Sequence, residues 1–139
     1  MPTDTLAAWS PRALALLRIV AALLFIAHGT MKLFNFPAGE TPMSVELFSL
    51  MGLAGILETF GGLLLLVGLF TRPVAFVLAG QMAAAYFMAH APQSFYPALN
   101  GGDAAVLFCF VFLYCVFAGP GAWSLDELRA ARSPALGRA

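Results

Sequence analysis

Four long apolar runs dominate the sequence and leave the chain few ways to fold. They cover residues 13–36, 45–69, 73–91 and 103–118. A helix needs about 20 mostly apolar residues to cross the hydrocarbon core of a bilayer. The chain is 61% hydrophobic and only 10% charged, the reverse of the balance in a soluble domain. The sequence therefore predicts an all-α membrane protein, a bundle of four transmembrane helices forming one domain over residues 1–139.

Basic residues lie unevenly around these runs. The connections near residues 37–44 and 92–102 contain no Lys or Arg. All the arginines fall on the other side of the predicted bundle: Arg12, Arg18, Arg72, Arg129, Arg132 and Arg138. Because cytoplasmic connections carry the excess of basic residues, this pattern predicts that both termini are cytoplasmic.

The segment after the fourth run has the features of a short helix at the membrane surface. The run stops at "GPG", and "WSLDELRAAR" follows at once. Ser124 and Glu127 have the spacing of a capping box. Leu125 and Leu128 share one side of the helix that would follow. The sequence thus predicts an interfacial helix over residues 124–132.

An acid stands near the middle of the second run. Glu58 is flanked, one helical turn away on either side, by Ala54, Gly55, Gly61 and Gly62. Small residues of this kind mark a helix face that packs closely on another helix. We therefore expect Glu58 to point into the bundle, where its carboxyl group is either neutral or paired with a cation.

The first run supplies two basic partners for this acid. His28 and Lys32 are four residues apart and share one helix face. By depth, His28 is the better partner for Glu58 and Lys32 the alternative, although Lys32 could equally pair with Asp103. Ionisable residues within a membrane indicate a functional site, so we assign Glu58 and His28 as candidate catalytic residues. A pair that only fixes helix packing is the alternative.

Further polar side chains gather toward the outer ends of the runs, which predicts a pocket that opens outward and closes near the midplane. Several also have ordinary structural explanations: anchoring at the interface, hydrogen bonding between helices, or capping. The candidate substrate-binding residues are Lys32, Gln81, Tyr86, His90, Asn100 and Asp103.

No cofactor motif is evident. Cys109 and Cys115 are six residues apart within one predicted helix and cannot form a disulfide with each other there. The sequence shows no haem, iron–sulfur, nucleotide or metal motif, so the cofactor stays open, with a quinone possible. A formal net charge of zero disfavours nucleic acid as a partner.

Several segments together resemble one family. "LLRIVAALLFIAHGTMKLF", "LAGILETFGGLLLLVGLFTRPVA", "NGGDAAVLFCFVFLY" and "GPGAWSLDEL" are similar, in this order, to the DoxX family. The resemblance implies a four-helix protein of the bacterial inner membrane. It carries over to His28, Gly29 and Lys32, to Glu58, Gly61 and Gly62, and to residues 119–126. Where many members have Glu after "NGG", this chain has Asp103.

The resemblance also implies a link to redox chemistry, because family members are associated with quinone-linked sulfur oxidation or described as proposed oxidoreductases and membrane partners of redox-stress enzymes. Three roles follow as hypotheses. The first is a redox component that binds a quinone-like or other small organic molecule. The second is a proton or solute transporter, and the third is an accessory subunit that anchors a redox partner. The expected partners are the lipid bilayer and either further copies of the chain or a redox protein.

Overall fold

The computed structural model describes residues 3–40 and 45–132, and these ranges contain helices and no strand. In chain order the helices are α1 (Thr3–Phe34), α2 (Leu50–Ile56), η1 (Leu57–Gly61), α3 (Gly62–Val67), α4 (Thr71–Ala85), η2 (Tyr86–His90), α5 (Pro97–Asn100), α6 (Asp103–Ala118) and α7 (Leu125–Arg132). Three stretches are long and apolar enough to cross a membrane: Asp4–Phe34, Leu50–Val67 and Thr71–His90. The prediction of an all-α membrane protein is confirmed; α6 is a shorter apolar helix of 16 residues.

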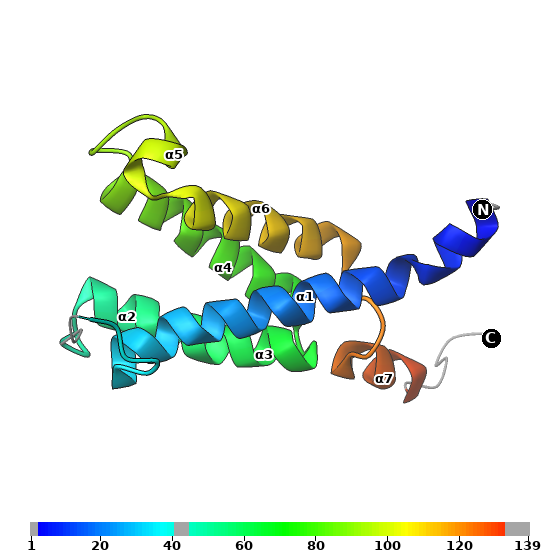
Figure 1. Cartoon of the computed structure of the whole chain (residues 1–139). Helices are drawn as coiled ribbons and strands as arrows, with labels where there is room; N and C mark the ends of the chain where they lie inside the picture. The colour runs from blue at the N-terminus through cyan, green and yellow to red at the C-terminus, as the bar shows by residue number, and fades with distance from the viewer. Residues whose placement is uncertain (1–2, 41–44, 133–139) are drawn as a thin grey trace.

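The first helix begins much earlier than the apolar run predicted. It starts at Thr3 instead of residue 13 and includes Pro11. Its first turn contains Asp4, an acid at the helix end that favours negative charge. At 32 residues α1 is about 48 Å long, more than a bilayer core requires. Its N-terminal part projects beyond the other helices (Figure 1), and hydropathy could not reveal this polar extension.

The second span starts later than predicted, at Leu50 instead of residue 45. The side chain of Ser49 accepts a hydrogen bond from the backbone N–H of Gly52, so Ser49 caps the helix. The helix then runs through α2, η1 and α3 without interruption and ends at Gly68, which has a left-handed conformation (φ 66°). The π-helical segment η1 lies in the middle and carries Glu58.

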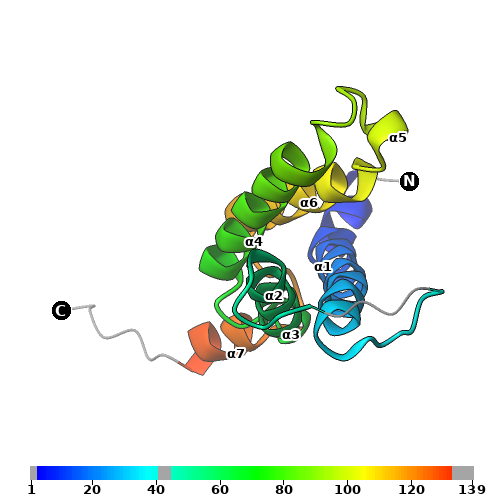
Figure 2. The ribbon, with the colours of Figure 1, turned by 90° about the vertical axis from the view of Figure 1, so that its left-hand side faces the viewer.

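The long helices form two pairs. The helix formed by α2, η1 and α3 packs along α1, and α6 packs along α4. The pairs meet near α7 and diverge toward the end where α2 and α5 lie (Figures 1 and 2). The shared core contains Phe25, Leu65, Leu78 and Phe112, all at most 1% exposed. The space between the diverging ends is where the candidate site lies.

Small residues bring α1 and the second span into close contact. A methyl group added at Gly29 would collide with the backbone and side chain of Thr59 and with Cβ of Glu58. One added at Gly62 would meet Ile26. The prediction that glycines mark a tight helix–helix crossing here is confirmed, and the crossing places Glu58 directly against α1.

The guanidinium of Arg18 connects several segments at the end of the fold opposite the diverging helix ends. Arg18 is 1% exposed, and all five of its N–H groups have a backbone carbonyl to which they donate. The donor–acceptor distances are Nε to Pro120 O 2.8 Å, Nη1 to Leu65 O 2.5 Å and to Leu66 O 2.8 Å, and Nη2 to Ala122 O 3.3 Å and to Trp123 O 3.0 Å. The side chain therefore ties α1 to the end of α3 and to the loop that follows α6.

The predicted C-terminal helix is present as α7, and its location at the membrane surface stays a prediction. The hydroxyl of Ser124 accepts from the backbone N–H of Glu127 at 3.2 Å, as the capping box predicted. The carboxylate of Asp126 accepts from the N–H groups of Phe70 and Thr71, at 2.9 and 2.8 Å. Burial would raise the pKa of Asp126, but these hydrogen bonds outweigh it and the net pKa lies below its ordinary value. The expected basic residue Arg138 lies outside the described residues.

Candidate functional site

A pocket of about 590 Å³ lies between the diverging helix pairs. Its walls come from α1, α2, η1, the α4–η2 helix and the start of α6, so all the spans contribute. Most lining residues are apolar, including Phe25, Leu57, Met82, Met88 and Phe108. The sequence does not assign these residues to a site, because large apolar side chains are equally suited to core and to lipid contact.

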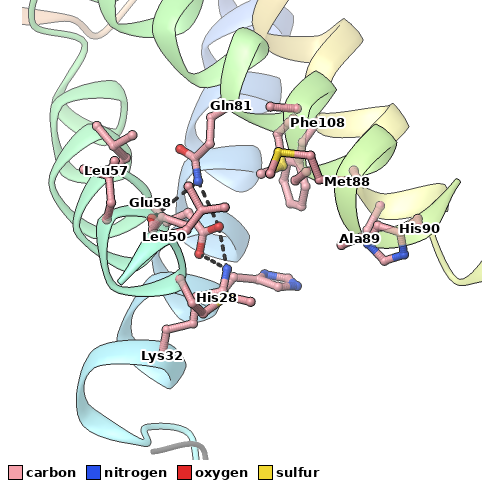
Figure 3. A pocket seen from close by; sticks show the side chains of 18 of the residues that line it. His28, Lys32, Leu50, Leu57, Glu58, Gln81, Met88, Ala89, His90 and Phe108 are labelled. Carbon is pink, nitrogen blue, oxygen red and sulfur yellow. Dashed lines mark hydrogen bonds and ion pairs between the residues drawn. The ribbon is translucent and has the colours of Figure 1, made fainter. Parts of the chain in front are cut away.

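A hydrogen-bonded cluster of three polar residues lies on one side of this pocket (Figure 3). Nζ of Lys32 lies 2.5 Å from both Oε1 and Oε2 of Glu58. Nε2 of Gln81 donates to Oε1 of Glu58 at 3.1 Å. Glu58 is 2% exposed and Lys32 16% exposed. The carboxylate of Glu58 on η1 is therefore held by the ammonium of Lys32 on α1 and the amide of Gln81 on α4.

Of the two cations considered for Glu58, Lys32 makes the contact. Nδ1 of His28 lies 2.8 Å from the carbonyl oxygen of Leu24, one turn earlier on the same helix. The imidazole packs edge-on against Phe108 at a centroid distance of 5.9 Å and lines the pocket. The imidazole is short and turned toward its own helix, whereas the long lysine side chain reaches across the crossing at Gly29. Glu58, His28 and Lys32 thus share one pocket. The partner of Glu58 is Lys32, and not His28, which residue depth had favoured.

His90 occupies another wall of the same pocket, on η2. Its Nδ1 lies 3.0 Å from the carbonyl oxygen of Asn100. Figure 3 shows His90 across the open space from His28 and Lys32. Both π-helical segments therefore carry a polar pocket residue, Glu58 on η1 and His90 on η2. Such segments occur frequently at functional sites.

Three of the predicted binding residues are not part of this pocket's lining. The hydroxyl of Tyr86 donates to the carbonyl of Phe95 at 2.9 Å. Asn100 is buried and donates to the carbonyl of Ser94 at 2.7 Å, so it holds the loop before α6. Asp103 is exposed at the start of α6. The structure gives Asn100 an indirect role, because its backbone carbonyl orients His90.

The pocket lies among groups that suit small-molecule binding and proton exchange. Within the described ranges no three His, Cys, Asp or Glu side chains lie close enough together to hold a metal ion. Cys109 and Cys115 are free thiols. The arrangement offers a paired carboxylate, two imidazoles and an amide beside an apolar volume.

Comparison with known proteins identifies the family of the chain. The DoxX family model matches residues 13–91, more than half of the chain, and this range includes His28, Lys32, Glu58 and Gln81. The chain belongs to the DoxX family.

Two relatives match this DoxX protein over most of its length. An uncharacterized protein of Haemophilus influenzae is 45% identical, with 89% of this chain and 96% of the relative covered. An uncharacterized membrane protein of Mycobacterium tuberculosis is 28% identical, with 91% of this chain and 87% of the relative covered. No solved structure matches the chain. The second relative is described as a membrane protein, in agreement with the apolar helices of this chain, and neither description names a reaction.

Proposed function

We propose that this DoxX protein is a multi-pass component of a redox system in the bacterial inner membrane, and that it binds a quinone-like or other small organic molecule beside Glu58. The observation that carries the proposal is the pocket of about 590 Å³, with apolar walls around a buried carboxylate–ammonium pair. Ligand sites are typically clefts of about 300–1,000 Å³, mostly apolar with a few placed polar groups.

The residues present fit a quinone-like molecule, which when bound supplies chemistry that couples electron transfer to proton uptake. His28 lines the pocket and can hold or release a proton at its second ring nitrogen. Lys32 balances the charge of Glu58 and adds positive potential on the pocket wall. The chain has no haem, iron–sulfur or nucleotide motif, so in this proposal a redox partner or a bound cofactor supplies the electrons.

The proposed orientation has four spans, with α6 as the fourth, and cytoplasmic termini. Support comes from the arginines, because Arg18, Arg72 and α7 gather at the end of the bundle opposite the pocket. By the positive-inside rule, we propose that this end faces the cytoplasm. The pocket then opens on the outer half of the membrane.

Transport receives less support. The inner half of the bundle is filled by Phe25, Leu65, Leu78 and Phe112 and closed by the Arg18 network, an arrangement that disfavours a continuous path. An accessory role, in which the chain anchors a redox partner as an oligomer or complex, is compatible with the same pocket and differs in having no reaction of its own.

The test is to identify what the pocket holds after purification in particles of native lipid. Organic extracts of the particles are analysed by mass spectrometry for small apolar molecules. Ala84→Trp places a large ring at a pocket-lining, exposed position of α4 and should deplete the specific ligand. Val77→Trp, at an exposed position of α4 outside the lining, is the matched control and should retain it.

The redox part needs a separate measurement. Oxidised-minus-reduced difference spectra and the redox-stress sensitivity of cells are compared for native protein and Glu58→Gln. A co-purified molecule that is depleted by Ala84→Trp, with a redox defect in Glu58→Gln, supports the proposal. Absence of any enriched molecule, together with unchanged redox behaviour of Glu58→Gln, would contradict it.

A further inference from the structure

The pocket's polar side chains have a marked imbalance between hydrogen-bond donors and acceptors. Among the lining residues that the structure describes, the polar side chains are His28, Lys32, Ser49, Glu58, Gln81 and His90. A bound molecule must complement the polar atoms that it covers, because a polar group that becomes buried without a partner is costly.

In its neutral form, each of the two imidazoles presents an acceptor to the pocket. A carbonyl oxygen can only accept, so Nδ1 of His28, 2.8 Å from Leu24 O, must carry the proton in that bond. In the neutral ring Nε2 is then a lone-pair acceptor. The same reasoning applies to His90, whose Nδ1 lies 3.0 Å from Asn100 O. The two rings stand on different walls of the pocket (Figure 3).

The amide of Gln81 and the hydroxyl of Ser49 offer the pocket no further donor. Nε2 of Gln81 faces two acceptors, Oε1 of Glu58 at 3.1 Å and the carbonyl of Ala54 at 3.4 Å, and these contacts define the orientation of the amide. Its Oε1 is buried and has no hydrogen-bond partner among the described residues. The hydroxyl of Ser49 already donates to the carbonyl of Glu46 and accepts from the N–H of Gly52.

Donors are scarcer. The ammonium of Lys32 contacts both oxygens of Glu58, and a lysine has three N–H groups, so at most one remains for a ligand. Glu58, as a carboxylate, adds acceptors only. The polar atoms that a ligand can reach are thus two imidazole acceptors against one donor.

We propose that the pocket selects a membrane-soluble molecule whose polar end carries hydroxyl groups, a phenol, a hydroquinone-type diol or an alcohol, over the corresponding ether or quinone. This inference rests on the proposed function, since it names the ligand class for the same pocket. The hydroxyl hydrogens meet Nε2 of His28 and of His90. The apolar part of the molecule lies against Met82, Met88 and Phe108, where flexible methionines adapt to its shape.

Two probes of nearly the same shape test the inference. para-Octylphenol donates one hydrogen bond, and its methyl ether, para-octylanisole, donates none. Binding of each to the full chain in lipid nanodiscs is measured by calorimetry. One hydrogen bond to a neutral acceptor is expected to make the phenol bind roughly three- to tenfold more tightly than the ether.

Variants assign that preference to the imidazoles. His28→Phe and His90→Phe keep an aromatic ring and remove the acceptor, so at least one of them should bring the phenol-to-ether ratio close to one. Met88→Leu, on the apolar wall, is the control: it changes both affinities alike and leaves the ratio unchanged.

The outcomes separate this inference from the proposed function. Equal binding of the two probes, tighter binding of the ether, or a ratio that neither histidine variant lowers would overturn the hydroxyl preference while leaving a ligand pocket in place. Failure of both probes to bind would reject the pocket as a small-molecule site and the inference with it.

Discussion

Replacing Arg18 by Met tests how far a single side chain holds together the end of the bundle opposite the pocket. The guanidinium donates to five backbone carbonyls at 2.5–3.3 Å. Hydrogen bonds to charged groups contribute about 1.5–3 kcal/mol each, which would sum to roughly 7–15 kcal/mol. That sum is too high, because burying the charge itself costs several kcal/mol.

The net effect follows from what remains after the substitution. Arg18→Met removes the charge and leaves several carbonyls without this donor, although Leu65 O still accepts from the N–H of Gly68. Each buried acceptor left unpaired costs about 1–3 kcal/mol, so we expect a net loss of roughly 3–5 kcal/mol. For a chain of 139 residues this corresponds to a fall in Tm of roughly 10 °C or more. Arg18→Lys has three N–H groups instead of five, so its Tm should lie between those of Arg18→Met and the native protein.

The assay is thermal unfolding of the purified protein in detergent micelles, followed by tryptophan fluorescence. Arg12→Met is the matched control, because Arg12 is exposed and makes one long hydrogen bond of 3.4 Å within its own helix together with a contact to Trp9. We expect it to change stability by at most about 0.5 kcal/mol. If Arg18→Met costs no more than Arg12→Met, the reasoning about the carbonyl network is wrong.

Two further predictions concern the cap of α4 and the helix crossing. Folding lowers the pKa of Asp126. Its contribution to stability is therefore fully present at a pH above the pKa of the unfolded state, near 3.8, and is lost as the pH falls through the lower pKa of the folded state. Asp126→Asn should cost about 1 kcal/mol at neutral pH and reduce the loss of Tm on acidification, whereas exposed Glu127→Gln should do neither. Gly29→Ala should cost about 1–3 kcal/mol because its methyl group collides with Thr59. Gly80→Ala, which meets open space, should be neutral or stabilising by up to about 1 kcal/mol, and equal Tm values for these two variants would contradict the close crossing.

The features that the sequence predicted well are those encoded by neighbouring residues. Runs of apolar side chains located the spans, and α6 begins and ends where the fourth run does, at Asp103 and Ala118. The spacing of Ser124 and Glu127 predicted a cap because both partners lie within one turn. Helix starts were less accurate, since the cap at Ser49 and the polar extension from Thr3 depend on backbone hydrogen bonds and not on hydropathy.

The features that the sequence did not reveal depend on contacts between distant segments. Arg18 was recognised only as a basic residue near one end, because its acceptors are carbonyls, which every residue has. Depth favoured His28 over Lys32 as the partner of Glu58, but rotamers and side-chain length decided the pairing. The two π-helical segments and the apolar walls of the pocket have no pattern of their own in one sequence.

The central claim is that the space beside Glu58 holds a small membrane-soluble molecule. An experimental density map of the protein in native lipid tests this most directly. The account predicts density in the pocket between His28 and His90, with the Lys32–Glu58 pair intact beside it. A map in which the two helix pairs close on each other and side chains fill that space would contradict the account.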